Sequence, residues 1–208
     1  MEKLIILTTI AMLALNSSAD SVILNQDANS FSDGGEFVAQ ITSPNQNYDF
    51  ITFCVQSQNG FSADQTYNFT ESSVDSFGNP LTLGTAFLFA EFENGKITAS
   101  NPTQDGELQA TIWTFQNQQL PVGFTISTVE NNPYYNLALT DLGDEAYQPN
   151  NGLYPVAIMQ LTDDNGSTAQ NQLITSVPES DKIASCTVLA GLIGTIFFFL
   201  RKTYEVTM

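Results

Sequence analysis

The run of apolar residues 183–200 near the C-terminus constrains this chain more than any other feature of its sequence. As a helix rising about 1.5 Å per residue it would be about 27 Å long, close to the ~30 Å hydrocarbon core of a bilayer. Arg201 and Lys202 follow it directly, and basic residues beside a span tend to stay in the cytoplasm. We therefore expect a transmembrane helix over 183–200 and a cytoplasmic basic tail over 201–208, with an exported body before them.

Residues 1–19 have the features of a secretory signal peptide. Lys3 supplies a charged start, an apolar stretch follows, and small residues end the segment. This pattern predicts cleavage after Ala19, whereas an N-terminal membrane helix fits less well because the apolar stretch is short. The exported body is then one domain over residues 20–177, with 178–182 as a short linker to the membrane helix.

The exported body is acidic and has almost no basic residues. The chain carries five Lys and Arg, 22 Asp and Glu and no His, for a formal charge of −17, and Lys96 is the only basic residue of the body. Nucleic acid is excluded as a partner, because phosphate contacts need Lys and Arg. Without His there is no Ser-His-Asp or Cys-His pair and no imidazole metal ligand. We expect no cofactor, no metal and no conventional hydrolase, which leaves a carboxylate pair acting on sugars as the enzymatic option.

The body contains one cysteine. Cys54 has no partner there for an intramolecular disulfide, because Cys186 lies within the predicted membrane helix. A lone thiol in an exported protein indicates a reactive group or an intermolecular link. A buried, inert cysteine that packs like a small hydrophobic residue is the alternative, and composition leaves both open.

The pattern of apolar residues predicts strands at both ends of the body and helices between them. β-branched and aromatic residues with partial alternation predict strands over 37–42, 48–56, 65–70, 153–162 and 170–177, the last two joined by a turn at 163–166. Helical spacing predicts helices over 83–92 and 105–119 and a weaker one over 133–142.

The second predicted helix carries the side chains of most interest. Asp105 is its candidate N-cap, and Gln109 and Trp113 share one stripe of its surface. We expect the final hairpin to join the strands of the first half. The order of elements predicts an α+β fold: an antiparallel, β-rich sandwich or barrel-like core with two to three inserted helices.

The C-terminal segment resembles the PEP-CTERM sorting signal that exosortases recognise in Gram-negative bacteria. That signal has a Val-Pro-Glu-Pro type motif, a membrane helix and a basic cluster. Here Val177, Pro178 and Glu179 precede the apolar run, and Arg201 and Lys202 follow it. A serine replaces the second proline, and further residues extend past the basic pair. The resemblance implies that an exosortase-type protease removes the tail and delivers the domain to the outer membrane, cell surface or extracellular matrix. An ordinary single-pass anchor is the alternative.

Two motifs in the body resemble those of thioester domains, known from surface adhesins of Gram-positive bacteria. Residues 52–55 (TFCV) are similar to their aromatic-Cys motif. Residues 108–113 (LQATIW) are similar to Thr-Gln-x-Ala-Ile/Val-Trp, with Leu in place of Thr and Thr in place of Ala. The resemblance implies an internal thioester, formed with loss of ammonia, in which Cys54 supplies the thiol, Gln109 the acyl group and Trp113 a shield against water.

These resemblances imply an exported, non-enzymatic surface or matrix protein that adheres covalently through Cys54 and Gln109. An external amine would attack the Gln109 carbonyl with Cys54 as leaving group, so the partner would be an amine-bearing surface ligand or a surface polysaccharide. Contact with the membrane is transient if the tail is removed and permanent if it stays. Two other functions remain open: a non-covalent structural matrix component with an inert, buried Cys54, and a carbohydrate-active enzyme.

Overall fold

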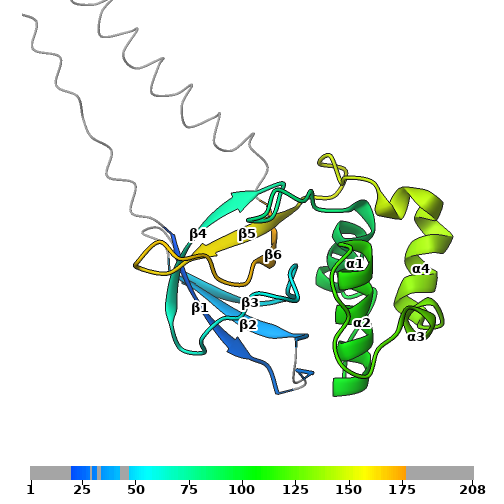
Figure 1. Cartoon of the computed structure of the whole chain (residues 1–208), viewed down its shortest axis with the longest axis horizontal. Coiled ribbons are helices and arrows are strands. Elements are labelled where there is room, and N and C mark those ends of the chain that lie inside the picture. Colours follow the sequence, from blue (N-terminus) through cyan, green and yellow to red (C-terminus); the bar gives the residue numbers. More distant parts are fainter. Residues whose placement is uncertain (1–19, 29, 32–33, 43–46, 177–208) are drawn as a thin grey trace, which may run out of the picture.

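The computed structural model describes residues 20–28, 30–31, 34–42 and 47–176. They form a curved antiparallel sheet of six strands with the helices gathered at one side of it (Figure 1). The strands are β1 (Ser21–Gln26), β2 (Phe37–Thr42), β3 (Asn47–Thr52), β4 (Thr66–Ser72), β5 (Val156–Thr162) and β6 (Gln172–Thr175). The helices are α1 (Leu83–Glu93), α2 (Pro102–Phe115), α3 (Ile126–Glu130), α4 (Pro133–Leu142) and the 3-10 turn η1 (Gly143–Tyr147). The predicted α+β class with a β-rich antiparallel core is confirmed.

Strand β1 is the element that the sequence prediction misses, although it lies near the middle of the sheet. The strand order is β3-β2-β1-β4-β5-β6, and β1 pairs with both β2 and β4. Val22 and Leu24 are fully buried and their neighbours are more exposed, which is the two-residue period of a strand with one buried face. The final hairpin joins the first-half strands through the β4–β5 pairing, as expected.

The two ends of the sheet meet around Cys54, so the sheet curls into a half-barrel. Beyond the end of β3, Cys54 forms an isolated antiparallel bridge with Gln172 of β6. The Val55 N–H donates to the Asn171 carbonyl at 2.9 Å, and the Leu173 N–H donates to the Phe53 carbonyl at 3.1 Å. We call this pairing of residues 53–55 with 171–173 the seam. It places the thiol where the first and last parts of the sheet come together.

The apolar core has two parts. One is built mainly by the strands and includes Val22, Leu24, Ile41, Met159 and Leu161. The other joins the sheet to the helices, with Phe53 and Cys54 from the seam packed in the same cluster as Leu108, Ile112 and Trp113 of α2. Helix α2 is thereby fixed against the seam, which positions its polar side chains near Cys54.

The predicted helices are present, but both ends of α2 need correction, because it spans Pro102–Phe115 and not the expected 105–119. Helix α4 has the predicted bounds, and α1 extends one residue further. Helix α2 begins at Pro102 because Asn101 is its N-cap: the Asn101 side chain accepts from the N–H groups of Thr103 and Gln104 at 3.1 Å. Asp105 is therefore not the cap; it lies inside the helix and is fully buried.

Two short elements were not predicted. Helix α3 starts with a capping box between Thr125 and Thr128 and buries Val129, and η1 follows α4 directly. Both are too short for a periodic pattern to reveal. Strand β3 also ends at Thr52, before the predicted limit of 56, because the chain leaves the sheet ladder there and enters the seam.

Several expectations fall on residues outside the described part of the chain. These are the signal peptide over 1–19 with cleavage after Ala19, the Val177, Pro178 and Glu179 motif, the linker 178–182, the helix 183–200, and the tail 201–208 with Arg201 and Lys202. Within the described residues, no helix has the length and apolar character needed to cross a bilayer.

We predict that Leu24→Ala lowers the free energy of unfolding by about 2–5 kcal/mol, the usual cost of removing a fully buried leucine side chain. Denaturant titration measures this change. Val122→Ala is the control, because Val122 is 89% exposed and its truncation should cost less than about 0.5 kcal/mol. Similar losses in the two variants would contradict the position of β1 within the core.

Candidate functional site

Cys54 lies in the seam with its side chain fully buried. The side-chain nitrogen Nε2 of Gln172 donates to the Cys54 sulfur at 3.8 Å. Burial raises the pKa of the Cys54 thiol well above its ordinary value, and the hydrogen bond from Gln172 offsets only part of that effect. The thiol is therefore protonated at neutral pH, and its sulfur is shielded from bulk water.

The side-chain amide of Gln109 is bound directly to the main chain of Cys54. Its Nε2 donates to the Cys54 carbonyl oxygen at 2.8 Å. Its Oε1 accepts from the Cys54 N–H at 3.0 Å and from the Gly35 N–H at 3.1 Å. Gln109 is fully buried. The structure thus brings together the two residues that the sequence motifs single out, 55 positions apart in the chain.

Two backbone N–H groups converge on a single carbonyl oxygen in this arrangement. Donors placed in this way stabilise the negative charge that develops on a carbonyl oxygen when a nucleophile attacks its carbon, most strongly where water is excluded. Gly35 and Cys54 supply these donors to Gln109. The Gln109 carbonyl is therefore polarised in the direction that favours attack.

Two glycines allow the chain to pass closely over helix α2. A Cβ atom on Gly34 would come within 2.9 Å of Trp113 Cη2 and 3.1 Å of Gln109 Cγ. Gly35 has a φ of +100°, a backbone conformation that side chains disfavour, and a Cβ there would overlap the Asp105 carboxylate. The hydrogen bond from Gly35 to Gln109 depends on this close approach.

Trp113 lies one helical turn beyond Gln109 and is 1% exposed. It belongs to the same buried cluster as Cys54, and the close approach of Gly34 places its ring beside the Gln109 side chain. Its indole N–H has no hydrogen-bond partner within the described residues. This position is compatible with the predicted shield and equally with an ordinary core residue.

Asp105 is a site residue that sequence reasoning assigned only to helix capping. Its Oδ1 accepts from the Glu36 N–H at 2.8 Å, and its Oδ2 accepts from the Phe31 N–H. Asp105 therefore holds the same segment whose Gly35 binds Gln109. Burial raises the pKa of Asp105 to about 6, although these two backbone donors oppose the shift. Burial likewise raises the pKa of Glu36 to about 7, and the negative charges of Asp105 and Asp27 add to the effect.

A group of buried amides surrounds the seam, and sequence reasoning missed it as well. Gln56, Asn171 and Gln172 are fully buried and Gln170 nearly so. Gln170 Nε2 donates to the Gln56 carbonyl at 2.9 Å, and Asn171 Oδ1 accepts from the Ser76 N–H at 2.8 Å. The run of three amides at 170–172, inside a segment otherwise rich in apolar residues, is the signal that could have revealed this group.

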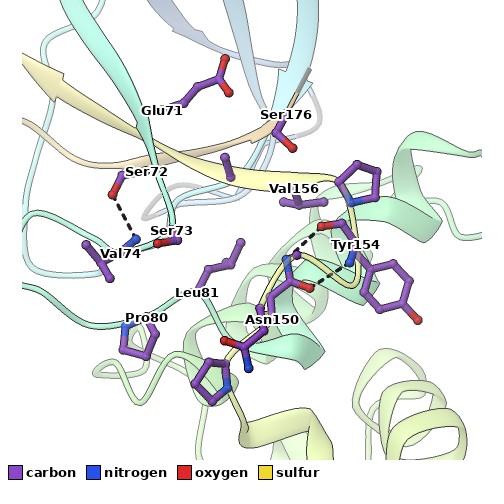
Figure 2. Close-up of a pocket in the computed structure, with 15 residues that line it drawn as sticks. Glu71, Ser72, Ser73, Val74, Pro80, Leu81, Asn150, Tyr154, Val156 and Ser176 are labelled. Atoms are coloured by element: carbon purple, nitrogen blue, oxygen red, sulfur yellow. Dashed lines mark hydrogen bonds between the residues drawn. The ribbon is translucent and has the colours of Figure 1, made fainter. Parts of the chain in front are cut away.

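Two pockets are relevant to function. A pocket of about 340 Å³ borders the segment that covers Gln109, with Gly34, Ser57 and Gln170 among its lining residues. A larger pocket of about 790 Å³, shown in Figure 2, does not have Cys54 among its lining residues; we call it the distal pocket. Its polar lining includes Glu71, Ser72, Ser73, Asn150, Tyr154 and Ser176.

One hydrogen-bonded turn shapes the wall of the distal pocket. The Asn150 amide donates to the Tyr154 carbonyl at 2.9 Å and accepts from the Tyr154 N–H at 3.0 Å (Figure 2). This pocket is separate from Cys54, Gln109 and Trp113, none of which lines it.

No protein-family model, curated protein or solved structure matches this chain. Within the described residues, no three His, Cys, Asp or Glu side chains are grouped in a way that would hold a metal ion. Function is therefore inferred from the chemistry that Cys54, Gln109 and their neighbours allow.

We predict that the unfolding free energy falls as pH rises from about 4 to 7. The folded-state pKa values of Glu36 and Asp105, about 7 and about 6, lie above their ordinary values of 4.5 and 3.8. The folded state thus binds more protons than the unfolded state in this window, and its advantage is lost as the two groups ionise. Glu36→Gln should flatten the profile and stabilise the protein at pH 8 by roughly 2 kcal/mol.

Urea denaturation across this pH range measures the effect. Glu145→Gln is the matched control, because it removes an equal charge from an exposed position. If the two variants had the same pH profile, the burial of Glu36 beside Asp105 would not be the cause.

Proposed function

We propose that this protein is a cell-surface or matrix protein that forms an internal thioester between Cys54 and Gln109 and uses it to attach covalently to amine-bearing ligands. The observation that carries this proposal is the Gln109 side-chain carbonyl, which is held by two backbone N–H groups against the residue that bears the thiol. We interpret the half-barrel and its seam as the barrel-like core that the sequence predicts. In this proposal, that core is the frame that holds the two side chains together.

The reaction that forms the thioester balances without a cofactor. The Cys54 sulfur adds to the Gln109 side-chain carbon, the carbon–nitrogen bond breaks, and ammonia leaves with the thiol proton. The N–H groups of Gly35 and Cys54 stabilise the oxyanion and remain bound to the oxygen afterwards. The hydrogen bond from Gln109 Nε2 to the Cys54 carbonyl is lost with the ammonia. The product is neutral, so the burial that disfavours a thiolate does not disfavour the thioester.

The surroundings protect such a bond until a ligand arrives. Cys54 and Gln109 are fully buried, and a dry site slows hydrolysis. The only Lys or Arg of the described residues is Lys96, whose ammonium is bound to Glu91 at 2.7 Å. Few internal amines therefore compete with an external one for the Gln109 carbonyl.

The proposed delivery route follows from the ends of the sequence. A signal peptide over 1–19 would export the chain, and the PEP-CTERM-like segment would direct it to an exosortase-type protease. The domain would then be released to the cell surface or its polysaccharide matrix, where amine-bearing ligands are within reach.

We predict that the intact mass of the purified protein is lower than its processed sequence by the mass of one ammonia. Cys54→Ser and Gln109→Glu should each abolish the deficit, because the first removes the thiol and the second replaces the amide by a carboxylate. Methylamine should add to the wild type, and peptide mapping should place it on Gln109.

Three other outcomes would each contradict the proposal. A wild-type protein of full mass would rule out the thioester and leave Cys54 as an inert core residue. A methylamine adduct on Gln172 instead of Gln109 would show that the acyl group belongs to β6 and not to α2, which would contradict the proposed pair. A deficit that persists in Cys54→Ser would show that the ammonia comes from another reaction.

The distal pocket supports a second candidate function, the non-covalent matrix component. Its lining includes the hydroxyls of Ser72, Ser73 and Ser176 and the carboxylate of Glu71, which are donors and acceptors suited to an uncharged, polyhydroxylated ligand. The carbohydrate-active enzyme would need two carboxylates facing such a pocket, whereas Glu71 is the single carboxylate among the lining residues of the distal pocket, and the buried pair Glu36 and Asp105 lines neither of the two pockets described above.

For this second candidate we predict that neutral oligosaccharides bind and that Ser176→Trp, which fills the distal pocket, weakens binding at least about tenfold. Calorimetric titration measures the affinity. Ser167→Trp, on the exposed β5–β6 turn, is the control. Equal affinities in the two variants would remove the distal pocket as the binding site.

A further inference from the structure

We infer that Gln172 is the hydrogen-bond donor that stabilises the Cys54 sulfur when the thioester opens, an inference that rests on the proposed function. Gln172 faces Cys54 across the seam bridge, and its Nε2 donates to the sulfur at 3.8 Å. Its side chain is fully buried, so this donor is held in place and is not shared with water.

Stability alone does not explain a glutamine at this position. The other contacts of Gln172 Nε2 are long, at 3.5 Å to each oxygen of Gln170, and its Oε1 has no hydrogen-bond partner within the described residues. Burying a polar group with incomplete hydrogen bonding is unfavourable, and an apolar side chain of similar size would avoid that cost. The hydrogen bond to the Cys54 sulfur gives this side chain a chemical role that an apolar residue could not fill.

The chemistry of ligand capture supplies such a role. An amine attacks the Gln109 carbonyl carbon, the carbon–sulfur bond breaks, and the sulfur leaves with the bonding electrons before it takes a proton from the amine. Negative charge thus develops on a sulfur from which bulk water is excluded. Gln172 Nε2–H is the side-chain donor that the described residues place on this atom, and a hydrogen bond to a developing charge lowers the barrier.

The same donor also assists thioester formation, because the protonated thiol gains negative character when it gives up its proton and attacks the carbonyl carbon. Formation is a single intramolecular event that can go to completion before the protein is assayed, whereas ligand capture is followed as a rate. Removal of the donor should therefore leave the final extent of thioester formation unchanged and slow ligand capture. A merely structural role would lower the extent of formation as well, through misfolding.

The test compares the wild type with Gln172→Leu, Gln172→Glu and, as a matched control, Gln160→Leu. Gln160 is a glutamine of β5 whose Nε2 donates to the Val74 carbonyl at 2.7 Å, away from the seam. Intact mass first measures the fraction of each protein that carries the thioester. The rate of methylamine addition is then measured by mass across a range of pH.

We expect full thioester formation in Gln172→Leu with methylamine addition slowed roughly tenfold or more, the scale of a lost hydrogen bond to a charged group. Gln172→Glu should be slower still at alkaline pH, where the buried carboxyl is ionised, because a carboxylate cannot donate and repels the sulfur. Its rate relative to the wild type should recover as pH falls and the carboxyl becomes a donor. Gln160→Leu should react at the wild-type rate.

The possible results distinguish a failure of the role of Gln172 from a failure of the thioester itself. If all variants form the thioester and react at equal rates, or if Gln160→Leu is slowed as much as Gln172→Leu, the role of Gln172 is overturned and the thioester stands. If the wild type itself has full mass, the proposed function fails and this role fails with it. If Gln172→Leu does not fold, the pH dependence of the Gln172→Glu rate ratio decides the question.

Discussion

The double hydrogen bond between the Gln109 side chain and the Cys54 main chain is the interaction on which the rest of the structure depends. It ties helix α2 to the seam that closes the sheet, and the bond from Gly35 adds the segment before β2 to the same point. Because all three groups are fully enclosed, loss of the amide would leave buried backbone donors unpaired, at a cost of about 1–3 kcal/mol each. The arrangement that stabilises the fold also presents a polarised carbonyl to a thiol.

Much of the fold could be predicted from sequence where a local pattern is long enough to be periodic. Helices α1 and α4 follow from apolar residues at helical spacing, and β2 from β-branched residues between turn signals. Strand β1 was missed because it lies just after the predicted signal peptide and its apolar residues, Val22, Ile23 and Leu24, are consecutive and do not alternate with polar ones. The seam depends on contacts between residues more than 100 positions apart, for which no local signal exists.

The candidate site was predictable only in part, again because contacts between distant residues leave no local signal in the sequence. The motifs around Cys54 and Gln109 selected two residues that the structure brings into hydrogen-bond contact, because their resemblance to thioester domains supplied a relation that spacing alone does not. Asp105 was assigned to the helix cap because an acidic residue at the start of a predicted helix favours that role, whereas Asn101 caps the helix and Asp105 is buried. The position of Gln172 at the sulfur follows from the pairing of β6 with the seam, which only the structure shows.

A high-resolution crystal structure of the protein purified without added amines tests the central claim most directly. The account predicts continuous electron density between the Cys54 sulfur and the Gln109 side-chain carbon, with Oε1 still bound by the N–H groups of Gly35 and Cys54 and no nitrogen at the Nε2 position. Separate side chains, with an intact Gln109 amide donating to the Cys54 carbonyl, would contradict it.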